Sequence, residues 1–205
     1  QAGRIFVAWE EEAPGERDLY GVQLAANGTP LTQEFTIATE LGSMEMVAVT
    51  AWNQLERQEF LVIWQTNTGG GDLAAQRYAQ GGGPLGMPFF VSHERHTQAK
   101  PAVVVLQNAD PRAYFVVWED FRAGGPGGIY GQRLTPEGER IGLHVGLTPL
   151  PYLQTQPALA YSSTSDRSLI VWANVHGGGG NQTTHVMAYS RLESLNYLAT
   201  HPLTL

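Results

Sequence analysis

The residues with the clearest chemical potential are an acid and an arginine that follow a tryptophan in the second half of the chain. Asp120 and Arg122 stand two residues apart, after Trp118 and before the glycine-rich stretch 124–128. In one interpretation the carboxylate contacts a ligand or metal while the guanidinium clamps an anionic group. In the other, the two side chains form an ion pair, or the acid hydrogen-bonds the backbone, and either contact fixes the loop.

Other polar residues fall in segments that we expect to be loops on one face of the molecule. Loops held by a rigid scaffold are frequent sites of ligand binding. Glycine-rich loops admit a ligand close to the backbone, although they also serve simply as wide turns. The candidate binding face consists of Glu10, Arg17, Asp72, His93, His96, Asp120, Arg122 and His176.

Two histidines, His93 and His96, are three residues apart, a spacing that suits a metal ion only on a helix. Their sequence lacks the histidine spacing of zinc proteases and falls in an expected loop. The sequence contains no nucleophile elbow, phosphate-binding loop or paired-carboxylate signature. It therefore predicts no catalytic residue, no metal site and no cofactor.

Composition narrows the classes of partner. The formal net charge is −7 and only 15% of residues are charged, so little positive charge is present to neutralise phosphates. This argues against nucleic acid and anionic membranes as partners. No apolar run reaches the roughly 18 residues that a membrane-spanning helix needs. The chain has no cysteine, which excludes disulfides, thiolate nucleophiles and cysteine-bound zinc.

The elements that would position these residues come from a fourfold repeat. Trp9, Trp64, Trp118 and Trp172 are spaced by 55, 54 and 54 residues, and each lies in an apolar run that precedes a polar or glycine-rich loop. The run 115–118 carries apolar groups on both faces, which indicates a strand that is covered on both sides. Apolar residues do not recur every 3.6 residues over a stretch long enough to form a helix, so the chain is expected to be all-β.

Each repeat is expected to form short antiparallel strands joined by turns. The predicted strands are 4–10, 18–25 and 35–39; then 46–52, 59–65, 72–78 and 87–92; then 100–107, 113–119, 129–134 and 140–148; and finally 157–161, 168–173, 185–192 and 197–205. A small sheet cannot cover itself, so we predict a single β-propeller domain or segment, with four-stranded blades at 1–42, 43–96, 97–152 and 153–205. A β-sandwich is the main rival, but it predicts one solvated face per strand.

The third repeat resembles a β-propeller repeat that is common in large extracellular bacterial proteins, with the pattern VVWxDxRxGxxxIYGQRLxxxG. The matching residues are Val116, Val117, Trp118, Asp120, Arg122, Gly124, Ile129 to Leu134, and Gly138. The other repeats match the pattern less well, since Thr66 and Asn174 occupy the position that Asp120 has in the third repeat. The resemblance covers essentially the whole chain. It implies blade architecture and an extracellular or cell-surface location, but no particular function.

The first repeat lacks the innermost strand that the other three repeats have. The chain is then a part of a longer propeller, or its first blade has three strands, or a neighbouring chain supplies a strand to the open edge. The predicted partners are accordingly another protein or further copies of the chain, with strand complementation at the N-terminal edge as one route. Glycans are a further class of predicted partner.

We predict a non-enzymatic extracellular β-propeller that acts as a binding or self-assembly module. The alternatives are a carbohydrate-binding lectin, with tryptophans as sugar-stacking platforms, and a hydrolase on a propeller scaffold. Trp52 lies outside the repeat and is the tryptophan that we expect to be exposed or specialised. Glycosylation sequons at Asn27 and Asn181 fall in expected loops.

Overall fold

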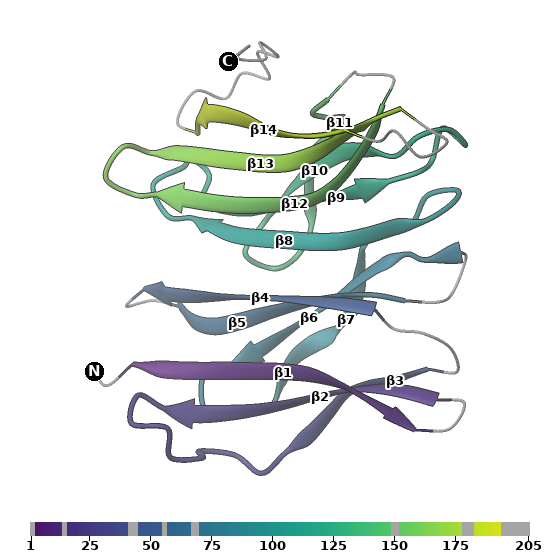
Figure 1. Ribbon diagram of the computed structural model, residues 1–205. Helices are drawn as coiled ribbons and strands as arrows, with labels where there is room; N and C mark the ends of the chain where they lie inside the picture. Colours follow the sequence, from purple (N-terminus) through teal and green to yellow (C-terminus); the bar gives the residue numbers. More distant parts are fainter. Residues whose placement is uncertain are drawn as a thin grey trace. The chain divides into compact units, whose positions relative to one another are not determined.

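The computed structural model describes residues 3–13, 16–40, 45–54, 57–66, 70–148, 152–177 and 183–193. The strands in these ranges form four antiparallel sheets, so the expectation of an all-β chain is confirmed (Figure 1). No helix in the described ranges is long and apolar enough to cross a membrane.

In each sheet, strands that follow one another in the chain lie side by side. The first sheet contains β1 (Arg4–Ala13), β2 (Glu16–Ala25) and β3 (Phe35–Glu40). The second contains β4 (Glu45–Gln54), β5 (Arg57–Gln65), β6 (Leu73–Ala79) and β7 (Pro84–Ser92). The third contains β8 (Gln98–Leu106), β9 (Ala113–Asp120), β10 (Gly128–Leu134) and β11 (Arg140–Gly146). The fourth contains β12 (Leu153–Ser162), β13 (Arg167–His176) and β14 (Thr183–Leu192).

These strands lie where the repeat predicted them, with small shifts at their ends. The first sheet has three strands, as the missing innermost strand required. The strand predicted at 197–205 lies outside the described residues. Closure of the sheets into a propeller ring stays a prediction.

The chain divides into two compact units, Gln1–His93 and Glu94–Leu205, and each unit contains two of the sheets. In the first unit, β1 lies against β4 (Figure 1). Phe6 and Leu19 of the first sheet pack there with Phe60, Trp64 and Tyr78 of the second. The ring centroids of Phe6 and Phe60 are 5.2 Å apart, a normal separation for interacting aromatic side chains.

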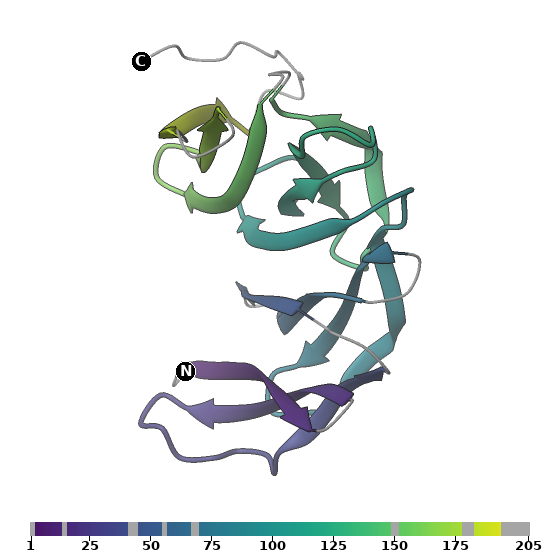
Figure 2. The ribbon, with the colours of Figure 1, turned by 45° about the vertical axis from the view of Figure 1, so that its right-hand side comes forward.

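In the second unit, β12 lies against β8 (Figure 2). Its core joins Phe115, Val117 and Ile129 of the third sheet to Ile170 and Trp172 of the fourth. Every residue of β9 is buried. The run 115–118 is thus buried on both faces, as predicted. The equivalent run 169–172 was expected to be covered in the same way, but its Leu169 is 46% exposed.

The glycine and glutamine of the IYGQRL motif have structural roles. A Cβ atom on Gly131 would lie 3.0 Å from the ring of Phe115 and 3.2 Å from Leu147. Gly21, in the first sheet, would meet Phe6 in the same way, at 3.1 Å. Nε2 of Gln132 donates to the carbonyls of residues 133 and 141, at 2.7 and 3.0 Å, where the pairing of β10 with β11 is irregular. The motif therefore preserves close packing and satisfies backbone groups.

We predict that Gly131→Ala lowers the free energy of unfolding by about 1–3 kcal/mol, because the added methyl group overpacks the site against Phe115. Urea denaturation would measure the loss. Gly125→Ala is the matched control, since nothing lies within 4 Å of its Cβ position. Equal stability of the two variants would contradict this account of the motif.

Candidate functional site

Asp120 forms a buried corner at the end of β9. Its Oδ2 accepts a hydrogen bond from Nε1 of Trp118 at 2.8 Å, and its Oδ1 accepts one from the backbone N–H of Arg122 at 2.9 Å. The guanidinium of Arg122 also donates two hydrogen bonds to the carboxylate, from Nε to Oδ1 at 2.9 Å and from Nη2 to Oδ2 at 2.6 Å. The structure thus contains the ion pair that fixes the loop. Both carboxylate oxygens are engaged within the corner, so Asp120 is poorly placed to bind a ligand.

Arg122 links this corner to its surroundings. Its guanidinium lies 4.4 Å from the ring centroid of Tyr130, a cation–π contact. Burial lowers the pKa of Arg122, but the hydrogen bond and negative charge of Asp120 outweigh burial and raise it overall. Nη2 also lies 3.2 Å from Nδ1 of His144, which is on β11. Arg122 is therefore a permanently charged side chain that is held in one place.

The second sheet has a different corner because Thr66 occupies the position of Asp120. Thr66 is too short to copy the carboxylate contact, and Nε1 of Trp64 is buried with no hydrogen-bond partner among the described residues. A cavity of about 240 Å³ lies here, in the first unit. It is lined by Ile37, Ala38, Thr39, Trp64, Thr66, Ala74, Pro88, Phe89 and Phe90. The second sheet thus combines a buried, unpaired indole N–H with a mainly apolar cavity that Trp64 helps to line.

Asp72 and His93 form a second polar contact near this cavity. Nδ1 of His93 donates to Oδ2 of Asp72 at 2.6 Å, and Oδ1 of Asp72 is buried with no partner in the described part of the chain. The His93 side chain is 63% exposed, and its ring centroid is 5.0 Å from that of Phe90. Phe90 lines the cavity, so the oriented imidazole lies close to the cavity rim.

The fourth sheet shows a third version of the corner, with Asn174 at the position of Asp120. Nε1 of Trp172 and Oδ1 of Asn174 are both buried and without partners among the described residues. Nδ2 of Asn174 lies 3.0 Å from Nε2 of His176. The ring of His176 packs on Tyr152, with centroids 3.9 Å apart, and lies near His185. His176 is therefore part of a ring cluster on this sheet.

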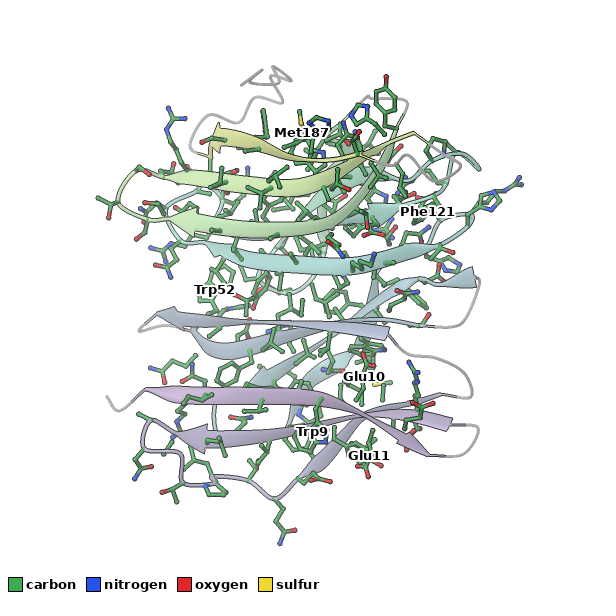
Figure 3. The ribbon with its side chains drawn as sticks, viewed as in Figure 1. Trp9, Glu10, Glu11, Trp52, Phe121 and Met187 are labelled. Carbon is green, nitrogen blue, oxygen red and sulfur yellow. The ribbon has the colours of Figure 1, made fainter. Side chains whose placement is uncertain are left out.

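The structure joins only some members of the predicted binding face. Asp72 contacts His93 in the first unit, and Asp120 contacts Arg122 in the second. Arg17 forms an exposed pair with Glu12 at 3.4 Å. In the same unit Glu10 is exposed, and Trp9 and Glu10 leave opposite sides of β1 (Figure 3).

The remaining predicted sites have different outcomes. His96 is exposed in the second unit, next to the glycine loop at Gly124. Asn27 is exposed in a turn, where its side chain accepts a hydrogen bond from the N–H of Thr29 at 3.1 Å; its glycosylation stays a prediction. Asn181 lies outside the described residues. Of the two expectations for Trp52, exposed or specialised, exposure is wrong, since this β4 residue is only 2% exposed.

Sequence reasoning missed several residues that matter here, namely Trp64 as a donor and Phe90, Arg140 and His144 as lining groups. One signal was available, because the aligned repeats place Thr66 at the position of Asp120 and so predict an unpaired indole N–H. The lining groups carry no such signal. They come from neighbouring strands and loops that only the folded chain brings together.

Comparison with known proteins shows fold similarity alone. No protein-family model matches the chain, and no curated protein matches its sequence. A protein of unknown function from Dyadobacter fermentans is 12% identical, with a TM-score of 0.57 over 93% of this chain and 50% of its own. The chain thus spans half the length of that protein. An endo-arabinase from Bacteroides thetaiotaomicron is 14% identical, with a TM-score of 0.49 over 91% of this chain and 70% of its own.

The structure does not support the partners that we expected from the sequence. These were another protein or further copies of the chain, with strand complementation at the N-terminal edge, and glycans. Strand β1 does form an edge, but Glu10, Glu11 and Glu12 follow one another there and are exposed, a charge pattern that opposes pairing with another strand. Of the four repeated tryptophans, Trp64, Trp118 and Trp172 are buried and only Trp9 is partly exposed, so the blades do not share a sugar-stacking surface. The structure and the comparisons supply no support for either class of partner, so we withdraw both.

We predict that Asp120→Ala lowers the free energy of unfolding of the second unit by about 3 kcal/mol. The change leaves the indole N–H of Trp118 and the guanidinium of Arg122 without their acceptor in a largely buried site. Urea denaturation of the purified chain would measure the effect. The exposed residue Glu139 provides the control, since Glu139→Ala should change stability by no more than about 0.5 kcal/mol.

His144 should make the second unit less stable in mild acid. Burial lowers the pKa of its imidazole, and the charges of Arg140 and Arg122 lower it further. The unfolded chain takes up this proton near pH ~6.5, whereas the folded chain takes it up only at lower pH. Stability therefore falls as pH drops through this window. Denaturation midpoints measured between about pH 7 and 5 should fall less steeply in His144→Gln, and identical slopes would refute the assignment.

Proposed function

We propose that the chain is a segment of a non-enzymatic β-propeller that binds a small apolar ligand in the cavity of the first unit. The four antiparallel sheets and the regular spacing of Trp64, Trp118 and Trp172 support blade architecture. Each unit packs one repeat against the next, which is how consecutive blades cover one another.

The unpaired Nε1–H of Trp64 is the observation that carries the binding proposal. A buried donor without an acceptor costs about 1–3 kcal/mol, and a ligand that supplies the acceptor recovers this loss. The aromatic walls from Phe89 and Phe90 favour a flat, apolar ligand. A cavity of about 150 Å³ holds benzene in another protein, so about 240 Å³ accepts one ring with a short substituent. The expected ligand is an aromatic or branched apolar molecule with one carbonyl-type acceptor.

Two features support binding rather than catalysis. The lining side chains with polar atoms are Thr39, Trp64 and Thr66, and none of them titrates near neutral pH, where a general acid or base works best. Asp120, the acid of the best-preserved repeat, is committed to Trp118 and Arg122.

Acetophenone and ethylbenzene test this function, because they share a ring and differ in the carbonyl acceptor. We predict that acetophenone binds about tenfold more tightly, which corresponds to about one net hydrogen bond. Titration followed by the ¹⁵N–¹H resonance of the Trp64 indole would measure both affinities and locate the contact.

Matched variants separate the hydrogen bond from the packing. Trp64→Phe removes the N–H and keeps an aromatic side chain, so acetophenone should then bind no better than ethylbenzene. Trp172→Phe changes the equivalent tryptophan of the fourth sheet and should preserve the difference. The proposal is overturned if the unmodified chain binds neither compound, or binds both equally.

A further inference from the structure

A second recess lies in the second unit, between the Asp120 corner and strand β11. It encloses about 190 Å³ and is lined by Glu94, Arg122, Arg140, Gly142, Leu143 and His144. Unlike the cavity of the first unit, it gathers charged and imidazole side chains. It shares no residue with that cavity, so inferences about the two sites are independent.

We propose that this recess binds a small oxyanion, a carboxylate or phosphate group, through Arg140, Arg122 and His144. Guanidinium groups are the preferred protein donors to both anions, because their N–H groups match the spacing of the oxygens. The proposal goes beyond the function proposed above in its location, its ligand and its donors.

Arg122 contributes a preorganised nitrogen. Nε and Nη2 of Arg122 donate to Asp120. The remaining nitrogen, Nη1, lies 3.8 Å from Oε1 of Glu94. This separation exceeds a hydrogen bond. The guanidinium is anchored from one side by Asp120 and by the ring of Tyr130, so little conformational entropy is lost when Nη1 binds an anion.

Arg140 contributes the second positive charge. It is exposed at the start of β11 and forms no ion pair with a residue in the described part of the chain. It lines the recess together with His144, and its charge helps to lower the pKa of that imidazole. An incoming anion would pair with this guanidinium without first breaking another ion pair.

His144 offers a buried N–H that lacks an acceptor. Its side chain is only 6% exposed, and its Nδ1 lies 3.2 Å from Nη2 of Arg122, a group that can only donate. Nδ1 is therefore the acceptor, and the proton of the neutral ring resides on Nε2. Nε2 is buried and has no partner among the described residues. This unpaired donor is independent of the two arginines and also calls for an acceptor.

Glu94 is the group that an oxyanion would replace. Its side chain is 39% exposed, and its Oε1 lies 3.5 Å from Nδ1 of His144 and 3.8 Å from Nη1 of Arg122. The contact with Nη1 is longer than an ordinary hydrogen bond, and the unprotonated Nδ1 of His144 has no proton to donate, so Glu94 is held loosely by the charge of Arg122 alone. The glutamate balances the positive charge in the empty recess and competes with the ligand once the ligand arrives.

Because Glu94 competes with the anion, one substitution should improve binding. Titration of the full chain with inorganic phosphate and, separately, with acetate should show binding of at least one anion by calorimetry. Glu94→Gln should tighten binding about threefold to tenfold, because it removes the competing charge. Arg140→Gln should weaken binding at least tenfold. Arg167→Gln, an exposed arginine of β13 outside the recess, should leave binding unchanged.

The relative affinities for phosphate and acetate indicate which class of molecule carries the bound group. Preference for phosphate points to phosphorylated small molecules, and preference for acetate points to carboxylic acids. Binding should also shift the Nε2 resonance of His144 in ¹⁵N NMR spectra. The proposal is overturned if neither anion binds, if Glu94→Gln weakens binding, or if Arg140→Gln and Arg167→Gln behave alike.

Discussion

The corner at Asp120 is the interaction on which the local architecture of the second unit depends. One buried carboxylate satisfies the indole of Trp118, the backbone N–H of Arg122 and the guanidinium of Arg122. Each of these donors would be costly to bury alone. Their shared acceptor sets the end of β9, fixes the start of the glycine loop and positions the arginine that faces the polar recess. An acid that resembles a catalytic group in the sequence is therefore a framework residue.

The same corner explains how the other repeats gain binding potential. Thr66 and Asn174 occupy the position of Asp120 in the second and fourth sheets, and the indole N–H groups of Trp64 and Trp172 lose their acceptor. A buried donor without an acceptor is an unfavourable feature in a folded chain, unless a ligand or an ordered water pairs with it. In the second sheet the tryptophan with the unpaired donor also lines a cavity, and that combination carries the proposed function.

The sheets themselves are stabilised by burial between consecutive repeats. Strands such as β9 are apolar on both faces, so a single sheet leaves too much apolar surface in water. The cores of both units contain side chains from two adjacent repeats, for example Phe6 with Phe60 and Phe115 with Ile170. This need for cover also accounts for the glycine of the motif, because Gly131 leaves room for the Phe115 ring.

The sequence by itself determined the elements. Repeated tryptophans, apolar runs and turn residues act locally, so the strands and their antiparallel order could be predicted, including the first sheet without its innermost strand. The sequence also indicated Asp72, His93, Asp120 and Arg122 as candidates, and it paired Asp120 with Arg122 but not Asp72 with His93. Only the tertiary structure decided which polar atoms remain unpaired and which cavities they line. Burial and hydrogen-bond geometry depend on neighbours far apart in the chain, and no local pattern encodes those distances. For the same reason, sequence reasoning expected Trp52 to be exposed or specialised, whereas the fold buries it.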